Sequence, residues 1–180
     1  MDGMTPLVDL NDFVWQRFKD DMADVTPEES DWRMLPDANT INVIVRHLRI
    51  EAEWHTACLE RGEPMPMDAS PELQKRIDEV PLDFEKNRAE LQRQYERFNA
   101  AMRETTLEGL AARTAEAYGE FGKKRPPHLL GFHQAVHLSM HWAQIRTIRT
   151  LYKKTRGEEV PARYYPGNVS YPKPQGKEPR

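Results

Sequence analysis

Apolar side chains recur at steps of three and four residues over four long stretches of the chain. This spacing limits the possible folds more than any other feature. The clearest stripe lies within 82–104, where large apolar and aromatic residues alternate steps of four and three, with one arginine among them. Such a stripe is typical of a helix that packs one face against its neighbours. No segment shows the clean alternation of apolar and polar residues that a half-buried strand has. The sequence therefore predicts an all-α protein, a four-helix bundle.

Three further long helices are expected at 9–24, 40–61 and 128–155. Asp9 or Asn11 is a candidate cap for the first of them, because a short polar side chain can accept a hydrogen bond from the first helical turn. The other two run up to a glycine, which commonly ends a helix.

The segments between the long helices are shorter and richer in proline and glycine. A helical turn is expected at 27–29, after a Thr-Pro pair, and a short helix at 70–80. Residues 32–39 and 62–70 are expected to be loops. Residues 105–127 remain ambiguous, because their apolar spacing favours a short helix and their three glycines weaken it.

A chain of 180 residues is long enough for one domain with its own core. We expect the bundle to occupy 1–157 and a C-terminal extension to occupy 158–180. The three tyrosines of the extension favour partial packing along the bundle. Its last seven residues are expected to be disordered.

Composition excludes several classes of partner and site. The net charge of −3, without a basic excess, argues against nucleic acid. No apolar run approaches the roughly 18 residues of a membrane span, and the N-terminus lacks the apolar core of a signal peptide, so we expect a cytoplasmic protein without a membrane partner. Cys58 is the single cysteine, which excludes an internal disulfide and a cysteine-rich zinc site. We expect it to be buried by packing.

Histidines mark the inward face of the last long helix. His137 and His141 stand one turn apart along it and about 40° apart around it, so they can reach one ion. His133 lies on the same face, one turn earlier. His47 lies on the apolar face of the helix at 40–61. Inward imidazoles on two helices predict a site for a divalent ion such as Zn, Ni, Fe or Cu, with a position left for water or substrate.

Spacing alone leaves open that these histidines are hydrogen-bonded core residues without a metal. Burying an unpaired polar group costs roughly 1–3 kcal/mol, which a metal, a water or a side chain can each offset. The sequence has neither the His-Glu-x-x-His of zinc proteases nor the Glu-x-x-His of di-iron bundles. Hemerythrin-like elements occur at His47-x3-Glu51 and His137-x3-His141, but too few further ligands accompany them.

Two segments carry a family pattern. Residues 44–48 read IVRHL, and residues 137–145 read HLSMHWAQI. In these segments the chain resembles the DinB/YfiT-like superfamily, whose fourth helix typically reads His-x3-His-x-Gly-Gln-Ile with an arginine after it. Ala143 stands here where glycine is usual, a small change at a helix contact. The resemblance extends from the first helix to about Tyr152.

The resemblance implies a four-helix bundle in which His47, His137 and His141 bind a divalent metal, commonly Ni or Zn. It also implies a homodimer, as many members form. Characterised relatives include metal-dependent transferases and isomerases that use low-molecular-weight thiols such as bacillithiol, mycothiol or glutathione. Many other members have no known activity.

Three neighbours of the histidines are further candidates. Glu51, one turn after His47, can be a fourth ligand, a general base or a solvated charge, the last being the usual state of a glutamate. His133 can support a ligand or face a substrate. Gln144, three residues after His141, can hydrogen-bond an imidazole or simply pack between helices.

Arginines and tryptophans near the histidines have more ordinary expected roles. Arg146 and Arg149 can pair with the carboxylates of an anionic thiol, but we expect surface salt bridges. We expect Trp54 and Trp142 to pack in the core rather than to line a pocket.

The sequence thus predicts a metal-dependent enzyme, such as one that transfers a low-molecular-weight thiol to an electrophile. Two alternatives stay open: a non-catalytic metal-binding or structural bundle, and a metal-assisted hydrolase. No residue of the sequence is assigned as catalytic.

Overall fold

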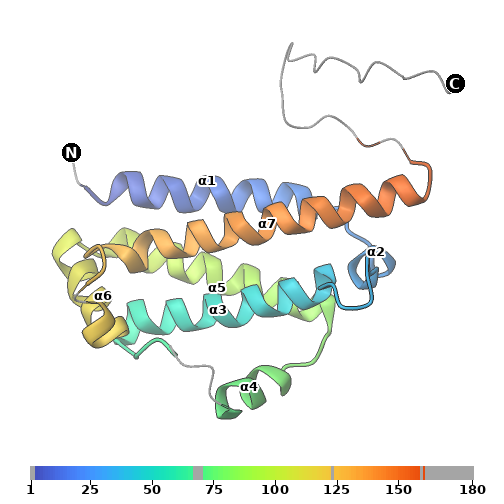
Figure 1. Ribbon diagram of the computed structural model, residues 1–180. Coiled ribbons are helices and arrows are strands. Elements are labelled where there is room, and N and C mark those ends of the chain that lie inside the picture. Colours follow the sequence, from blue (N-terminus) through green and yellow to red (C-terminus); the bar gives the residue numbers. More distant parts are fainter. Residues whose placement is uncertain (1–2, 67–70, 123, 159, 161–180) are drawn as a thin grey trace, which may run out of the picture.

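The computed structural model describes residues 3–66, 71–122, 124–158 and 160. Within these residues the chain forms helices and no strands (Figure 1). The helices are α1 (Thr5–Met22), α2 (Pro27–Asp31), α3 (Ile41–Arg61), α4 (Pro71–Asp78), α5 (Phe84–Glu104), α6 (Leu107–Gly122) and α7 (Leu129–Thr155). The predicted all-α class is confirmed.

The long helices α1, α3, α5 and α7 lie side by side and form the predicted four-helix bundle (Figure 1). In this bundle α3 packs against α5 and α7, while α1 packs against α7 and α5. The short helices lie in the connections. At one end of the bundle α6 packs against both α3 and α7, so three helices converge there.

The limits of α3 follow the local signals in the sequence. The side-chain oxygen of Thr40 accepts a hydrogen bond from the Val43 backbone N–H, which caps the first turn. At the other end Gly62 adopts a φ of 67°, in the left-handed region that glycine favours. This helix holds His47 in its second turn and directs the side chain toward α7.

The start of α1 differs from the prediction. The helix begins at Thr5, and Met4 occupies the cap position without a side-chain capping bond. Met4 and Val8 are both buried, so their packing extends the helix toward the N-terminus. Asn11 is not a cap: it is fully buried and donates a hydrogen bond to the Gly131 carbonyl oxygen at 2.7 Å. This bond fixes α1 against the first turn of α7.

The ambiguous region between the third and fourth long helices contains a helix, α6. Leu110, Ala117 and Tyr118 on one of its faces are buried, and this packing offsets the weak helix propensity of glycine. The backbone leaves helical geometry at Gly119, whose φ is 52°. The helix therefore places Tyr118 at its inner end, facing α7.

The core confirms the predicted apolar stripe of α5. Leu91, Tyr95 and Phe98 are at most 1% exposed. The Tyr95 hydroxyl donates a hydrogen bond to the Gln134 carbonyl oxygen of α7 at 2.9 Å, so this large buried side chain leaves no unpaired donor. Cys58 is buried, as predicted.

Arg149 does not form the surface salt bridge that the sequence predicted, because its side chain is buried. Its Nε donates to Glu29 Oε1 at 2.7 Å and its Nη2 to Asp24 Oδ1 at 2.9 Å. Its Nη1 donates to the Asp21 carbonyl oxygen. The guanidinium thus ties α7 to α2 and to the end of α1.

The predicted extension at 158–180 lies outside the described residues, apart from Glu158 and Val160, so its packing and the domain boundary stay predictions. Part of the predicted loop at 62–70 also lies outside them. Among the described helices, none has the length and apolar character needed to span a membrane.

Candidate metal centre

Three histidines from two helices converge inside the bundle. His137 Nε2 lies 3.1 Å from His47 Nε2 and 3.1 Å from His141 Nε2. One ring nitrogen from each residue lies within 4.8 Å of the other two. All three side chains are half-buried. Among the described residues, no other group of three or more histidine, cysteine or acidic side chains comes this close together.

The nitrogen spacing matches what a divalent ion requires. With metal–nitrogen bonds of about 2.0–2.1 Å, ligand nitrogens lie about 3.4 Å apart in tetrahedral geometry and about 3.0 Å apart at right angles. The two measured distances of 3.1 Å fall between these values. Three imidazoles suit Zn and Ni, and they leave at least one position open.

Gln144 sets the proton position on one of the rings. Its exposed amide oxygen Oε1 lies 2.9 Å from His141 Nδ1. An amide oxygen only accepts hydrogen bonds, so Nδ1 carries the proton and Nε2 presents its lone pair to the cluster. Gln144 is exposed and lies where it can orient a candidate ligand, so it is not packed between helices.

Hydrogen bonds between the rings cannot satisfy the whole cluster. His137 Nε2 faces two ring nitrogens, His47 Nε2 and His141 Nε2. A ring nitrogen is either a donor or an acceptor, so His137 cannot make both a donated and an accepted bond through Nε2. One of the two nitrogen contacts is therefore left without a well-formed hydrogen bond, whereas a cation between the three nitrogens can accept a lone pair from each. The donor set and its geometry thus fit a divalent metal.

His47 and His137 are in the protonation state that a metal ligand needs. Burial, together with the neighbouring imidazoles, lowers the pKa of His47 to about 4 and that of His137 to about 3. Both rings are therefore neutral at pH 7, and a metal does not compete with protons for them.

Comparison with known proteins places this arrangement in a family. The model of the DinB superfamily matches residues 10–145 of the chain. The chain belongs to the DinB superfamily. The matched region includes His47, His137 and His141, and it confirms the resemblance inferred from the sequence. No curated protein and no solved structure matches this DinB domain.

Removing the Gln144 amide is expected to weaken metal binding without unfolding the bundle. Partners of metal-bound histidines typically contribute 10–100-fold in affinity, so Gln144→Ala should raise the Kd for Zn²⁺ by about that factor. Gln144→Glu keeps an acceptor for Nδ1–H and should keep the affinity. Competition titration with a chelating dye measures both, with the exposed Thr147→Ala as control. Equal affinity of Gln144→Ala and wild type would show that the amide has no such role.

A cavity of about 400 Å³ opens beside the histidine cluster. His137 lines it, so the cluster has one side that faces an accessible space. The other lining side chains mix polar and apolar groups from α3, α6, α7 and two loops. They are Glu51, Met65, Pro66, Tyr118, Arg125, Leu129 and His133.

His133 joins a second group of polar side chains rather than the cluster itself. Its Nδ1 lies 2.8 Å from the Tyr118 hydroxyl and 3.2 Å from His55 Nε2. His55 is fully buried, and its Nδ1 donates to the Glu51 carbonyl oxygen at 2.7 Å. Sequence reasoning missed both His55 and Tyr118. The spacing of four between His47, Glu51 and His55 is the signal that places all three on one face of α3.

Glu51 is neither a solvated charge nor a member of the cluster. Its side chain is 22% exposed, and burial raises the pKa of its carboxyl group to about 7. The close group of candidate ligand atoms contains the three histidines without it. The structure therefore does not support the hemerythrin-like pairing or the role of fourth ligand.

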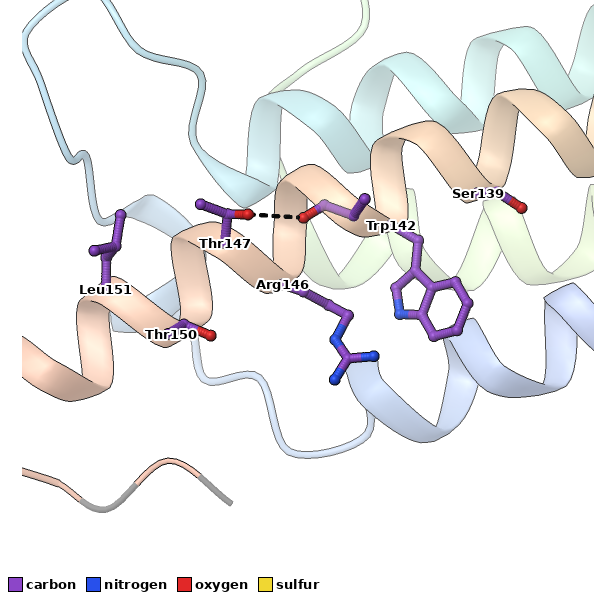
Figure 2. Close-up of a pocket in the computed structure, with 7 residues that line it drawn as sticks. Ser139, Trp142, Arg146, Thr147, Thr150 and Leu151 are labelled. Atoms are coloured by element: carbon purple, nitrogen blue, oxygen red, sulfur yellow. Dashed lines mark hydrogen bonds between the residues drawn. The ribbon is translucent and has the colours of Figure 1, made fainter. Parts of the chain in front are cut away.

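A second hollow, of about 570 Å³, lies along the solvent-facing side of α7 and holds none of the clustered histidines (Figure 2). Trp142 and Arg146 project into it, with the Arg146 guanidinium 5.6 Å from the Trp142 ring. Trp142 Nε1 donates to Asp21 Oδ2 at 2.8 Å. Trp54 packs at the edge of the core, as predicted, whereas Trp142 packs there and also lines this hollow, which the sequence did not predict. This hollow carries no group suited to metal chemistry.

Proposed function

We propose that this DinB domain is a metal-dependent enzyme that binds a low-molecular-weight thiol at the three-histidine centre and transfers it to an electrophile. His47, His137 and His141 hold the ion, with Zn or Ni preferred. When bound, such an ion lowers the pKa of a thiol and stabilises the thiolate as a nucleophile.

The observation that carries this proposal is the position of the cavity. A closed metal site with four protein ligands would be structural, whereas three ligands beside an open space are typical of catalytic sites. His137 belongs to both the cluster and the cavity wall. A small thiol and its acceptor can therefore meet next to the histidines.

Side chains of the cavity have separate functions in this proposal. Met65, Pro66 and Leu129 offer an apolar surface to the electrophile. Burial raises the pKa of Tyr118 well above its usual value, so its hydroxyl stays protonated and can donate a hydrogen bond. Arg125 stands at the exposed rim, where a guanidinium can attract an anionic group.

Thiol-dependent turnover tests the proposal. Protein reconstituted with Zn²⁺ or Ni²⁺ is assayed with 1-chloro-2,4-dinitrobenzene and glutathione, cysteine or 2-mercaptoethanol. We expect conjugation that falls to the background rate in His47→Ala and is unchanged in His128→Ala. His128 precedes α7 and lies outside the cluster.

The same assay separates the other candidate functions. Hydrolysis of an ester without added thiol would favour a metal-assisted hydrolase. Metal binding without turnover of any combination of thiol and electrophile would favour a non-catalytic bundle. A rate that persists in His47→Ala would contradict metal-dependent catalysis.

The homodimer stays a prediction, which sedimentation analysis tests.

A further inference from the structure

Glu51 combines two features that are rarely found together in a structural glutamate. Its carboxyl group is largely buried, and it lines the cavity that also contacts His137. It stands one turn after His47 on α3, so the backbone that positions a candidate ligand also positions the carboxyl group.

Within the part of the chain that the structure describes, no lysine or arginine forms an ion pair with this carboxyl group. Among the described residues, the one ionic contact of Glu51 is with His55, whose Nδ1 lies 3.9 Å from Oε2. Burial lowers the pKa of His55 to about 3, so this imidazole is neutral at pH 7. Its Nδ1 proton already goes to the Glu51 carbonyl oxygen. A buried carboxylate without a partner is costly, and such groups are concentrated at functional sites.

The titratable groups around Glu51 already hold their protons, are weak bases, or are engaged in other hydrogen bonds. The His133 Nδ1 is within hydrogen-bond distance of Tyr118 and His55. The charge of Glu51 also contributes to the raised pKa values of Tyr118 and Cys58, which places all three in one electrostatic environment. The groups that face it are His55 and Cys58 of α3, Tyr118 of α6, His133 and His137 of α7, and Arg125 at the rim.

We propose that Glu51 is the catalytic base of this site and that its carboxylate takes the proton that a thiol loses on binding at the three-histidine centre. This inference rests on the thiol chemistry proposed above. The thiol S–H bond breaks, its electron pair stays on sulfur, and an O–H bond forms on the Glu51 carboxyl group. The proton then passes to the leaving group of the electrophile or to water.

The acidity of Glu51 suits this role. A glutamate in water has a pKa of 4.5 and holds a proton poorly at neutral pH, whereas burial raises the pKa of Glu51 to about 7. A group whose pKa lies near the working pH both accepts and releases protons efficiently.

A proton count on thiol binding tests the assignment without measuring turnover. Zinc-loaded protein is titrated calorimetrically with 2-mercaptoethanol at pH 7.5, in buffers of different ionisation enthalpy. A thiol with a pKa near or above 8.5 brings about 0.9 proton at this pH. Wild type should release less than about 0.3 proton to the buffer. At pH 7.5 about three-quarters of Glu51 is ionised before the thiol binds, and we expect the charge of the bound thiolate to raise the pKa of this carboxyl group well above 7.5, so that it keeps the proton. Glu51→Gln should release about 0.9 proton per thiol bound.

Two variants control the experiment. Glu53→Gln removes a half-exposed carboxylate of the same helix that pairs with Arg49, and it should behave as wild type. Glu51→Asp keeps a proton acceptor and should restore a low count. Equal release near 0.9 proton in wild type and Glu51→Gln would overturn the role of Glu51 while leaving thiol binding intact. Failure of 2-mercaptoethanol to bind the zinc-loaded protein would overturn the thiol chemistry itself, and the role of Glu51 with it.

Discussion

Adding Zn²⁺ or Ni²⁺ to the metal-free protein is expected to raise its free energy of unfolding by about 4 kcal/mol, once the free metal reaches about 1,000 times its Kd. The folded chain presents His47, His137 and His141 already in place, and burial keeps the His47 and His137 rings neutral at pH 7. The unfolded chain separates them by up to 94 residues of sequence and offers no such site. Urea denaturation with and without the metal measures the gain.

His137→Ala is expected to abolish this metal-dependent gain. His137 Nε2 lies 3.1 Å from the nitrogens of both other histidines, so its loss removes the central ligand. His128→Ala removes a histidine of the same region and should leave the gain intact. A gain of the same size in His137→Ala would show that the metal binds elsewhere.

Arg149→Leu is expected to destabilise the fold by about 3–5 kcal/mol, because it leaves the buried Glu29 carboxylate without its cation. Glu29 is 2% exposed and accepts from Arg149 Nε at 2.7 Å. The same change breaks the links from α7 to Asp24 and to the backbone of Asp21. Urea denaturation of the metal-free protein measures the loss.

Two comparisons isolate the contribution of the buried ion pair to the free energy of unfolding. Arg156→Leu removes an exposed arginine that pairs with Glu28 and should leave the free energy of unfolding close to that of wild type. Replacing both partners, in Glu29→Leu with Arg149→Leu, removes the uncompensated charge and should recover much of the loss. A loss below 1 kcal/mol in the single Arg149→Leu variant would contradict the account of this contact.

The long helices could be predicted because their signals are local. Apolar periodicity, the Thr40 cap and the Gly62 stop each act within a few residues, and α3 forms where they place it. The start of α1 depends instead on burial of Met4, and α6 on burial of its Leu110 face. Those contacts come from distant parts of the chain, so local propensity did not reveal them.

The residues of the candidate site likewise differ in whether local sequence signals could predict them. Spacing on two helices, together with the family resemblance, pointed to His47, His137 and His141, which the structure brings together. Tyr118 lies on a helix that the sequence left ambiguous. His55 is buried by contacts across the bundle.

The chemical state of a side chain was also beyond the sequence. The sequence favoured a surface salt bridge for Arg149 and left the role of Glu51 open, since burial and pairing are properties of the fold. Only the packed structure shows that Arg149 forms a buried ion pair and that the carboxyl group of Glu51 faces a cavity.

The most direct test of the central claim is the metal content of the untagged protein, measured by plasma mass spectrometry. Wild type is compared with His47→Ala, His137→Ala and His128→Ala after purification and after reconstitution. We predict about one Zn or Ni ion per chain in wild type and His128→Ala, and loss of that ion in the other two variants. Wild-type protein without stoichiometric metal after reconstitution, or equal content in all four proteins, would contradict a metal centre at the three histidines.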